Sequence, residues 1–249
     1  MTSEDTELQR AALGVAEALK GSVRRCVGGS RRVAVAFSGG IDSSVVAVCA
    51  REVTEVFLCS GYARGSRDER AAAEGASTLG MEFVGVPIGA AEVAGEAGRS
   101  GALSLMDRSL SVLFSTVSQR AMRSGAERIL LGQLADELFG GYAKYQMELG
   151  AAGEDSARKM MEQDVDAYLA GGIGRDKESC SKWLEAVFPF ADSEMIAVAG
   201  GIPMSLKIKG GIRKAVLRKA ALLLGVPESI ASAPKKAAQY SSGVQKLLG

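Results

Sequence analysis

The sequence predicts an α/β fold, a doubly wound parallel sheet with a mostly helical C-terminal part. Short apolar runs rich in β-branched residues alternate with helix-like segments up to about residue 145, and the pattern beyond it is mostly helical. Such alternation is typical of βαβ units, which build parallel sheets. We therefore expect an N-terminal helix over 1–30, an α/β core over 31–145, and a helical part of the same domain over 146–249.

Each element of the core follows from its own spacing. Apolar residues recur every three or four positions from Leu8 to Val23, which predicts an amphipathic helix. Buried strands are predicted at 32–37, 55–59, 82–86 and 128–132. Further helices are predicted from about residue 42, over 67–80 and over 103–123, and the Gly/Ala-rich stretch after residue 86 is predicted to be a loop.

The loop after the first strand has the chemistry of a phosphate site. Residues 38–44 read Ser-Gly-Gly-Ile-Asp-Ser-Ser and join a strand directly to a helix. Glycines let the backbone approach an anion, and a helix start supplies unsatisfied N–H groups and a positive dipole end. The hydroxyls of Ser38, Ser43 and Ser44 add donors, and Asp42 can hold the Mg²⁺ that accompanies a polyphosphate. A bare Ser-Gly-Gly is more often a simple turn, but the full string at this junction favours a site.

A second polar loop follows the fourth strand. Residues 130–142 read Leu-Leu-Gly-Gln-Leu-Ala-Asp-Glu-Leu-Phe-Gly-Gly-Tyr. A helix start with two favourably placed acids explains Asp136 and Glu137, but not the whole string. Because doubly wound sheets bind ligands at the carboxyl ends of their strands, we expect both loops at one edge of the sheet.

Composition excludes several kinds of chemistry. The chain has 249 residues and no histidine, which excludes Ser-His-Asp hydrolysis, Cys-His proteolysis and histidine-ligated metal sites. Its four cysteines form no C-x-x-C pair, which disfavours a zinc site or a disulfide framework. The net charge of +1 gives no electrostatic case for a nucleic-acid or membrane partner. No apolar run approaches the ~18 residues of a membrane span, and the first ten residues are polar and acidic, so we expect a cytoplasmic protein.

The loop at 38–44 resembles the pyrophosphate-binding loop of the N-type ATP pyrophosphatases, the PP-loop superfamily. Its fold is of the adenine nucleotide alpha hydrolase-like, HUP type, and its members include asparagine synthetases, β-lactam synthetase, NAD synthetase and tRNA-modifying enzymes. They cleave ATP between the α and β phosphates, activate an oxygen as an adenylate, and let a nucleophile displace AMP. The Gly-Lys-Ser/Thr ending of a Walker loop is missing, which disfavours kinase chemistry.

The loop at 130–142 resembles the S-G-E-G-S-D-E-L-F-G-G-Y signature of the C-terminal synthetase domain of asparagine synthetases. Residues 136–142 match it without a gap. Further segments that resemble this family lie at 65–68, 175–176, 185–192, 207–218 and 234–244. The resemblance covers roughly residues 30–249 and implies ATP and Mg²⁺ as the small molecules bound.

The resemblance also implies roles for particular residues. Those expected to bind ATP are Ala36, Ser38, Gly39, Gly40, Asp42, Ser43, Ser44, Leu131 and Gly132; those expected to hold Mg²⁺ are Asp42 and Asp136; those expected to act in catalysis are Gln133, Glu137, Lys235 and Lys236. The tail lysine would stabilise charge on the phosphates as a fixed cation. The spacing of the tail differs from the family's by about one residue, so both lysines qualify, and Lys236 is preferred. A solvated surface charge is the alternative for either lysine.

Three departures from the family matter. Residue 2 is Thr and only 37 residues precede Ser38, so we expect no glutaminase domain, and ammonia from solution or from a separate glutamine amidotransferase subunit. Gln133 replaces a glutamate of the signature, and a neutral amide cannot accept a proton at neutral pH. Val187 replaces an arginine, so aspartate is one candidate among small carboxylate substrates.

Three functions are compatible with these observations. The leading one is an ATP-dependent, AMP- and pyrophosphate-forming amide ligase that joins a carboxylate to ammonia. The second is a tRNA-modifying enzyme, favoured by a small basic cluster and disfavoured by the near-neutral charge; the cluster comprises Arg24, Arg25, Arg31 and Arg32. The third, motivated by Gln133 and Val187, is a nucleotide-binding subunit that has lost turnover. A homodimer is compatible with each of them.

Overall fold

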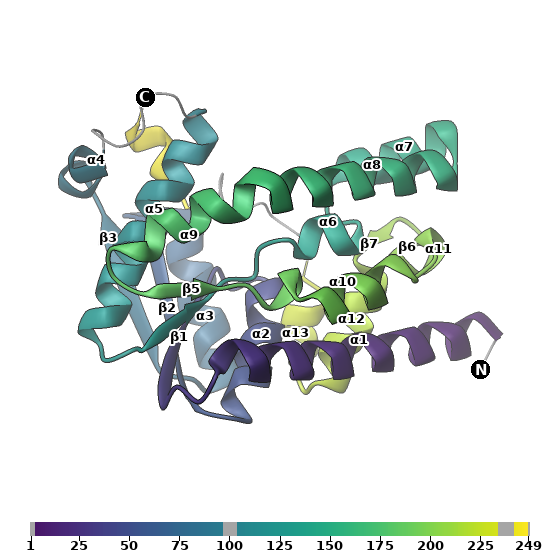
Figure 1. Cartoon of the computed structure of the whole chain (residues 1–249), viewed down its shortest axis with the longest axis horizontal. Helices are drawn as coiled ribbons and strands as arrows, with labels where there is room; N and C mark the ends of the chain where they lie inside the picture. Colours follow the sequence, from purple (N-terminus) through teal and green to yellow (C-terminus); the bar gives the residue numbers. More distant parts are fainter. Residues whose placement is uncertain (1–2, 97–103, 234–241, 249) are drawn as a thin grey trace.

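The computed structural model describes residues 3–96, 104–233 and 242–248. At its centre lies a five-stranded sheet in the order β3-β2-β1-β4-β5, in which every neighbouring pair is parallel (Figure 1). The strands are β1 (Arg32–Ala36), β2 (Glu55–Ala63), β3 (Phe83–Ile88), β4 (Arg128–Leu130) and β5 (Glu185–Val187). The predicted doubly wound parallel sheet is confirmed.

Helices cover both faces of this sheet. One apolar core takes residues from α1 (Ser3–Val27), α2 (Ile41–Arg51), α3 (Arg67–Leu79) and α12 (Ala215–Leu223), and the other from α5 (Leu105–Arg123) and α9 (Ile173–Ser181). Val33 and Val35 of β1 point into the first core and Ala34 into the second, as the two-residue period of a strand requires. Burial on both faces explains why β1 is a continuous apolar run.

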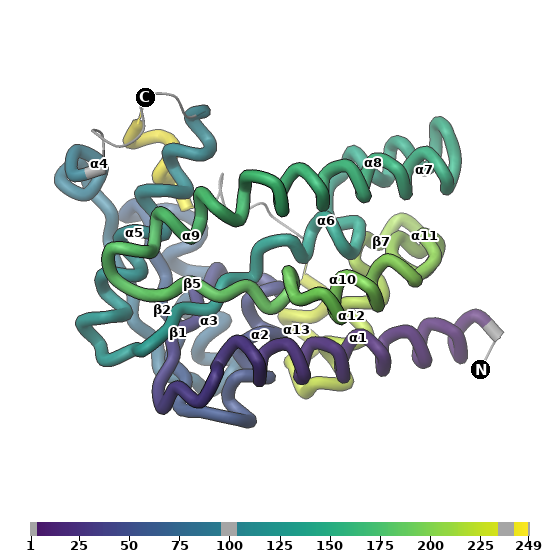
Figure 2. The backbone as a smooth tube through the Cα atoms, in the orientation of Figure 1, coloured from purple at the N-terminus to yellow at the C-terminus, as the bar shows by residue number. Residues whose placement is uncertain are grey.

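The C-terminal part is mostly helical, as predicted. It comprises α6 (Ala135–Phe139), α7 (Ala143–Ala152), α8 (Glu154–Ala167), a π-helical turn η2 (Tyr168–Gly172), η3 (Pro189–Ala191), α10 (Ser193–Gly200), α11 (Met204–Lys207), the hairpin β6 (Ile208–Lys209) and β7 (Ile212–Arg213), α13 (Glu228–Ala231) and η4 (Val244–Leu247). The chain path in Figure 2 brings α10 and α12 beside α1, and all three contribute to the same apolar core.

Two elements differ from the sequence-based expectation. The stretch predicted as a loop after β3 contains a helix, α4 (Ala90–Glu96), because alanine and glutamate favour helix and the Glu92 carboxylate accepts a hydrogen bond from the Gly89 N–H at 2.8 Å. The edge strand β5 was not predicted, since its three residues are too few to show a strand period. None of the helices in the described ranges combines the length and apolar character needed to cross a bilayer.

Candidate active site

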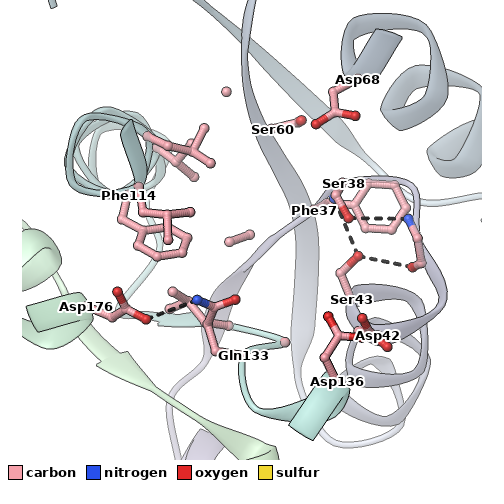
Figure 3. Close-up of a pocket in the computed structure, with 18 of the residues that line it drawn as sticks. Phe37, Ser38, Asp42, Ser43, Ser60, Asp68, Phe114, Gln133, Asp136 and Asp176 are labelled. Atoms are coloured by element: carbon pink, nitrogen blue, oxygen red, sulfur yellow. Dashed lines mark hydrogen bonds between the residues drawn. The ribbon is translucent and has the colours of Figure 1, made fainter. Parts of the chain in front are cut away.

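A cavity of about 370 Å³ lies at the carboxyl edge of the sheet, where the strand order reverses between β1 and β4. Doubly wound sheets bind their ligands at this point, and the volume suits a small molecule. The loops that follow β1 and β4 line the cavity together with α5 and α9, and Figure 3 shows their side chains converging on it. The predicted meeting of the two loops at one edge is therefore confirmed.

One wall of the cavity is apolar. It is built from the ends of β1, β2 and β4 and from one face of α5, through Ala36, Cys59, Leu110, Leu113, Phe114, Val117 and Leu131. The opposite end is polar, with the loop at 38–44 and the acids of α6. A ligand with an apolar ring at one end and several negative charges at the other matches this division.

The loop at 38–44 forms the N-terminus of α2. Gly40 is the N-cap residue and no side chain caps the helix, so its first N–H groups face the cavity end without a side-chain partner. Gly39 has φ +75°, and a Cβ there would collide with the carbonyl oxygen of Ala71 on α3. The loop can adopt this path only because residue 39 lacks a side chain.

The three serines of this loop occupy different positions. Ser38 and Ser43 line the cavity, and the Ser38 N–H donates to Ser43 Oγ at 3.4 Å. Ser44 is fully buried outside the cavity lining, and its hydroxyl donates to the Gly40 carbonyl at 2.8 Å. The structure therefore brings Ser38 and Ser43 to the cavity and places Ser44 behind the loop, where it holds the turn.

A buried lysine joins the two loops. Lys214, which precedes α12, has no exposed surface, and its Nζ lies 2.5 Å from Asp42 Oδ1 and 2.7 Å from Asp136 Oδ1. Burial lowers the pKa of Lys214, and the nearby carboxylate of Asp42 opposes that shift. The ammonium group thus fixes the first turn of α2 against α6 from behind the cavity.

Two glycines make this close approach possible. A Cβ on Gly132 would lie 3.2 Å from the Asp42 carbonyl carbon and from Ser43 N. A Cβ on Gly141 would collide with Asp136 Oδ1 and would lie 2.5 Å from Lys214 Cε. Both positions therefore require glycine for a packing reason rather than for turn geometry.

Glu137 lies beside Asp136 on α6 and also lines the cavity. Its Oε1 accepts a hydrogen bond from the Tyr142 hydroxyl at 2.8 Å. Burial raises the pKa of Glu137, and the hydrogen bond from Tyr142 opposes that shift. Glu137 is thus a half-buried carboxylate at the polar end of the cavity.

Gln133 forms part of a separate polar cluster. Its Nε2 donates to Asp176 Oδ2 on α9 at 3.1 Å, and the Tyr168 hydroxyl donates to the same oxygen at 2.8 Å. All three residues line the cavity, and Figure 3 shows Gln133 and Asp176 across from the phosphate loop. Burial raises the pKa of Asp176, and the two hydrogen bonds oppose that shift.

The donor set fits a magnesium ion that is shared with a ligand. Within residues 3–96, 104–233 and 242–248, no group of three or more His, Cys, Asp or Glu side chains forms a metal cage. Mg²⁺, however, is usually held by one or two carboxylates together with substrate phosphates and water. Asp42 and Asp136 supply two carboxylates at the polar end, as that arrangement needs.

The structure brings most of the predicted site residues to one cavity. The residues that line it are Ala36, Ser38, Gly39, Gly40, Asp42, Ser43, Leu131, Gly132, Gln133, Asp136 and Glu137. Lys235 and Lys236 lie outside the described residues. On either side of them, Ala233 lines the cavity and the Ser242 carbonyl accepts a hydrogen bond from Ala63 N–H at the end of β2.

Sequence reasoning missed Lys214, Tyr168 and Asp176. Lys214 and Asp176 lie in segments that resemble the family, and this was the signal that pointed to them. Nothing local distinguishes them, because Lys214 is 172 residues from Asp42 and Asp176 is 43 residues from Gln133. Their partners become apparent only when the chain is folded.

Comparison with known proteins places the chain in a family. The sequence matches the asparagine synthase family over residues 14–153 and 148–248. It is 30% identical over 268 residues to a Methanocaldococcus jannaschii protein named "Putative asparagine synthetase (glutamine-hydrolyzing) 1", which covers 93% of this chain and 49% of that protein. It is also 30% identical over 146 residues to "Asparagine synthetase domain-containing protein 1" of Mus musculus, covering 56% of this chain and 23% of that protein.

The fold is shared with a more distant enzyme. The structure of NMN synthetase from Francisella tularensis superposes with a TM-score of 0.51 at 12% identity, over 95% of this chain and 78% of that one. The chain spans about half the length or less of the curated relatives named above. Because the family match extends over nearly all of its residues, the chain belongs to the asparagine synthase family.

Proposed function

We propose that the chain is an ATP-dependent amide ligase that activates a carboxylate as an acyl-adenylate and then joins it to ammonia. The observation that carries this proposal is the polar end of the cavity, where an uncapped helix N-terminus adjoins two carboxylates held by the buried Lys214. Such an end suits a polyphosphate. The apolar wall of α5 and the strand ends suits an adenine ring.

The first half-reaction is expected to follow from this division. The carboxylate oxygen of the substrate bonds to the α-phosphorus of ATP, and the bond from that phosphorus to the bridging oxygen breaks, releasing pyrophosphate. The backbone at the start of α2 and the hydroxyls of Ser38 and Ser43 bind the leaving phosphates. Asp42 and Asp136 would hold Mg²⁺, which supplies positive charge against the phosphates when bound. Lys236 or Lys235 is proposed as a further cation at the reacting phosphate.

A small charged carboxylate such as aspartate suits the rest of the cavity. Its lining includes Arg67 and Asp68 at the start of α3. It also includes Arg175 on α9, whose guanidinium lies 3.4 Å from the Asp107 carboxylate on α5. Groups of both signs favour a zwitterionic substrate over a fatty or aromatic acid. The nitrogen is proposed to come from free ammonia or from a separate amidotransferase.

The basic cluster gives little support to a tRNA substrate. Arg25 pairs with Asp192 at 2.7 Å, Arg32 pairs with Glu82 at 2.7 Å, and Arg31 also has a carboxylate partner. The cluster surrounds the start of β1, which is the opposite edge of the sheet from the cavity. A neutralised surface away from the cavity is a poor guide for RNA.

Product analysis tests the proposal. With ATP, Mg²⁺, aspartate and ammonium chloride, we expect AMP and pyrophosphate to form in equal amounts, measured by ³¹P NMR and anion-exchange chromatography. The same mixture without a carboxylic acid is the control and should leave ATP intact. Release of ADP and phosphate in place of AMP would contradict cleavage between the α and β phosphates.

A further inference from the structure

Asp176 places a buried carboxylate in the cavity wall across from the phosphate loop (Figure 3). Its exposed fraction is 7%, and its Oδ2 accepts both hydrogen bonds, from Gln133 Nε2 and from the Tyr168 hydroxyl. No hydrogen bond between described residues ends on Oδ1. The carboxylate is therefore fixed through one oxygen, and the second oxygen is left for a donor inside the cavity.

The orientation of Gln133 follows from the same contact. An ionised carboxylate only accepts hydrogen bonds, so the Gln133 amide must turn its NH₂ group toward Asp176. Its oxygen then points away from Asp176, as Figure 3 shows. Gln133 Oε1 and Asp176 Oδ1 are thus two acceptors on neighbouring side chains of one cavity wall. A nitrogen that carries N–H groups is the ligand that two such acceptors bind.

The charges around Asp176 suit proton transfer. Its titratable and charged neighbours are Tyr168, Arg175 on the same helix and Asp107 on α5, and Arg175 already pairs with Asp107 at 3.4 Å. Burial raises the pKa of Asp176 above the ordinary aspartate range. A carboxylate with a raised pKa is a better match for a proton released near neutral pH than an exposed one.

We propose that Asp176 is the general base of amide formation and that Gln133 orients the nitrogen nucleophile; this inference rests on the proposed function. The nitrogen of ammonia attacks the acyl carbon of the adenylate, the N–C bond forms, and the nitrogen becomes positively charged. One proton passes from this nitrogen to Asp176 Oδ1. The bond from the acyl carbon to the phosphate oxygen then breaks, and its electron pair leaves with AMP. The pair of residues thereby restores the carboxylate that Gln133 lacks.

Glu137 is the competing carboxylate in the cavity. It lies next to Asp136 on α6, at the end that carries Asp42 and Lys214, so its negative charge belongs to the phosphate end. Its Oε1 is occupied by the Tyr142 hydroxyl at 2.8 Å. Gln133, which stands in place of the family's glutamate, bonds to Asp176 and not to Glu137.

The test separates the two half-reactions. In Asp176→Asn we expect aspartate-dependent ATP–pyrophosphate exchange within about threefold of the unaltered protein, but ammonia-dependent amide formation lowered by about 100-fold or more. Hydroxylamine, which is uncharged at neutral pH, should restore most of the product as hydroxamate, because it needs less help from a base. Glu137→Gln is the comparison and should not reproduce this split. Thermal unfolding of each variant checks the fold.

A double variant gives a sharper readout. Gln133→Glu combined with Asp176→Asn exchanges the amide and the carboxylate across the same hydrogen bond. We expect it to form amide from ammonium chloride at least about tenfold faster than Asp176→Asn alone, since a base returns to the site. A purely structural role for Asp176 would not predict this recovery.

Several results would overturn the assignment. Equal loss of exchange and amide formation in Asp176→Asn would assign Asp176 to adenylation or folding. Unchanged amide formation, or no recovery with hydroxylamine and with the double variant, would exclude it as the base. Absence of exchange in the unaltered protein is a different outcome, because it would overturn the proposed function and this inference together.

Discussion

Replacing Lys214 with methionine is expected to lower ATP–pyrophosphate exchange by about 100- to 1,000-fold and to destabilise the fold by about 3–5 kcal/mol. The Lys214 side chain is completely buried, and its Nζ lies within 2.7 Å of a carboxylate oxygen on both Asp42 and Asp136. Methionine keeps the length of the chain but leaves two half-buried carboxylates with no cation between them. Urea unfolding and the exchange assay measure the two effects.

Lys209→Met is the matched control for this change. Lys209 lies five residues earlier, is partly exposed, and pairs with Glu4 at 3.3 Å and Asp5 at 3.8 Å on the surface. Exposed pairs contribute less than about 1 kcal/mol, so unfolding and exchange should change little. Full exchange activity in Lys214→Met would remove the lysine from the phosphate end as described.

Gly39→Ala is expected to lower the unfolding free energy by about 2–4 kcal/mol and the exchange rate by about 100-fold. At φ +75° a side chain is strained, and its Cβ would collide with the backbone carbonyl of Ala71. Relief of this collision must move either the loop or α3. The positions of the N–H groups that bind phosphate would then shift.

Gly40→Ala separates backbone strain from the loss of any glycine. Gly40 has φ −87°, which alanine adopts freely, and its Cβ would meet only Ser38 Oγ at 3.3 Å. We expect a stability loss of less than about 1 kcal/mol, from the weaker N-cap alone. Equal destabilisation by both substitutions, in chemical denaturation, would contradict the close approach of the loop to α3.

The sequence was sufficient for the fold because its pattern is local. Each of the first four strands is an apolar run bounded by turn residues, and β1 through β4 form where those runs were found. The edge strand β5 was missed, since three residues against a single neighbour carry no period. The helix α4 was missed because its glycines resemble a loop, whereas a cap at Gly89 favours helix.

The site was predictable only in part, for a different reason. The phosphate loop and the acids of α6 are contiguous strings, so their chemistry could be seen along the chain. Lys214 acquires its role from α2 and α6, and Asp176 from Gln133, across distances in sequence that no local pattern encodes. Ser44 shows the converse, because a hydroxyl inside the motif turns out to hold the loop's backbone.

The measurement that tests the central claim most directly is ATP–pyrophosphate exchange by the unaltered protein with Mg²⁺, aspartate and a panel of other carboxylic acids. The account predicts exchange that requires both Mg²⁺ and one particular acid, and that is absent when either is omitted. Such a result would establish adenylation and identify the substrate together. Measurable ATP binding with no exchange for any acid would contradict the account.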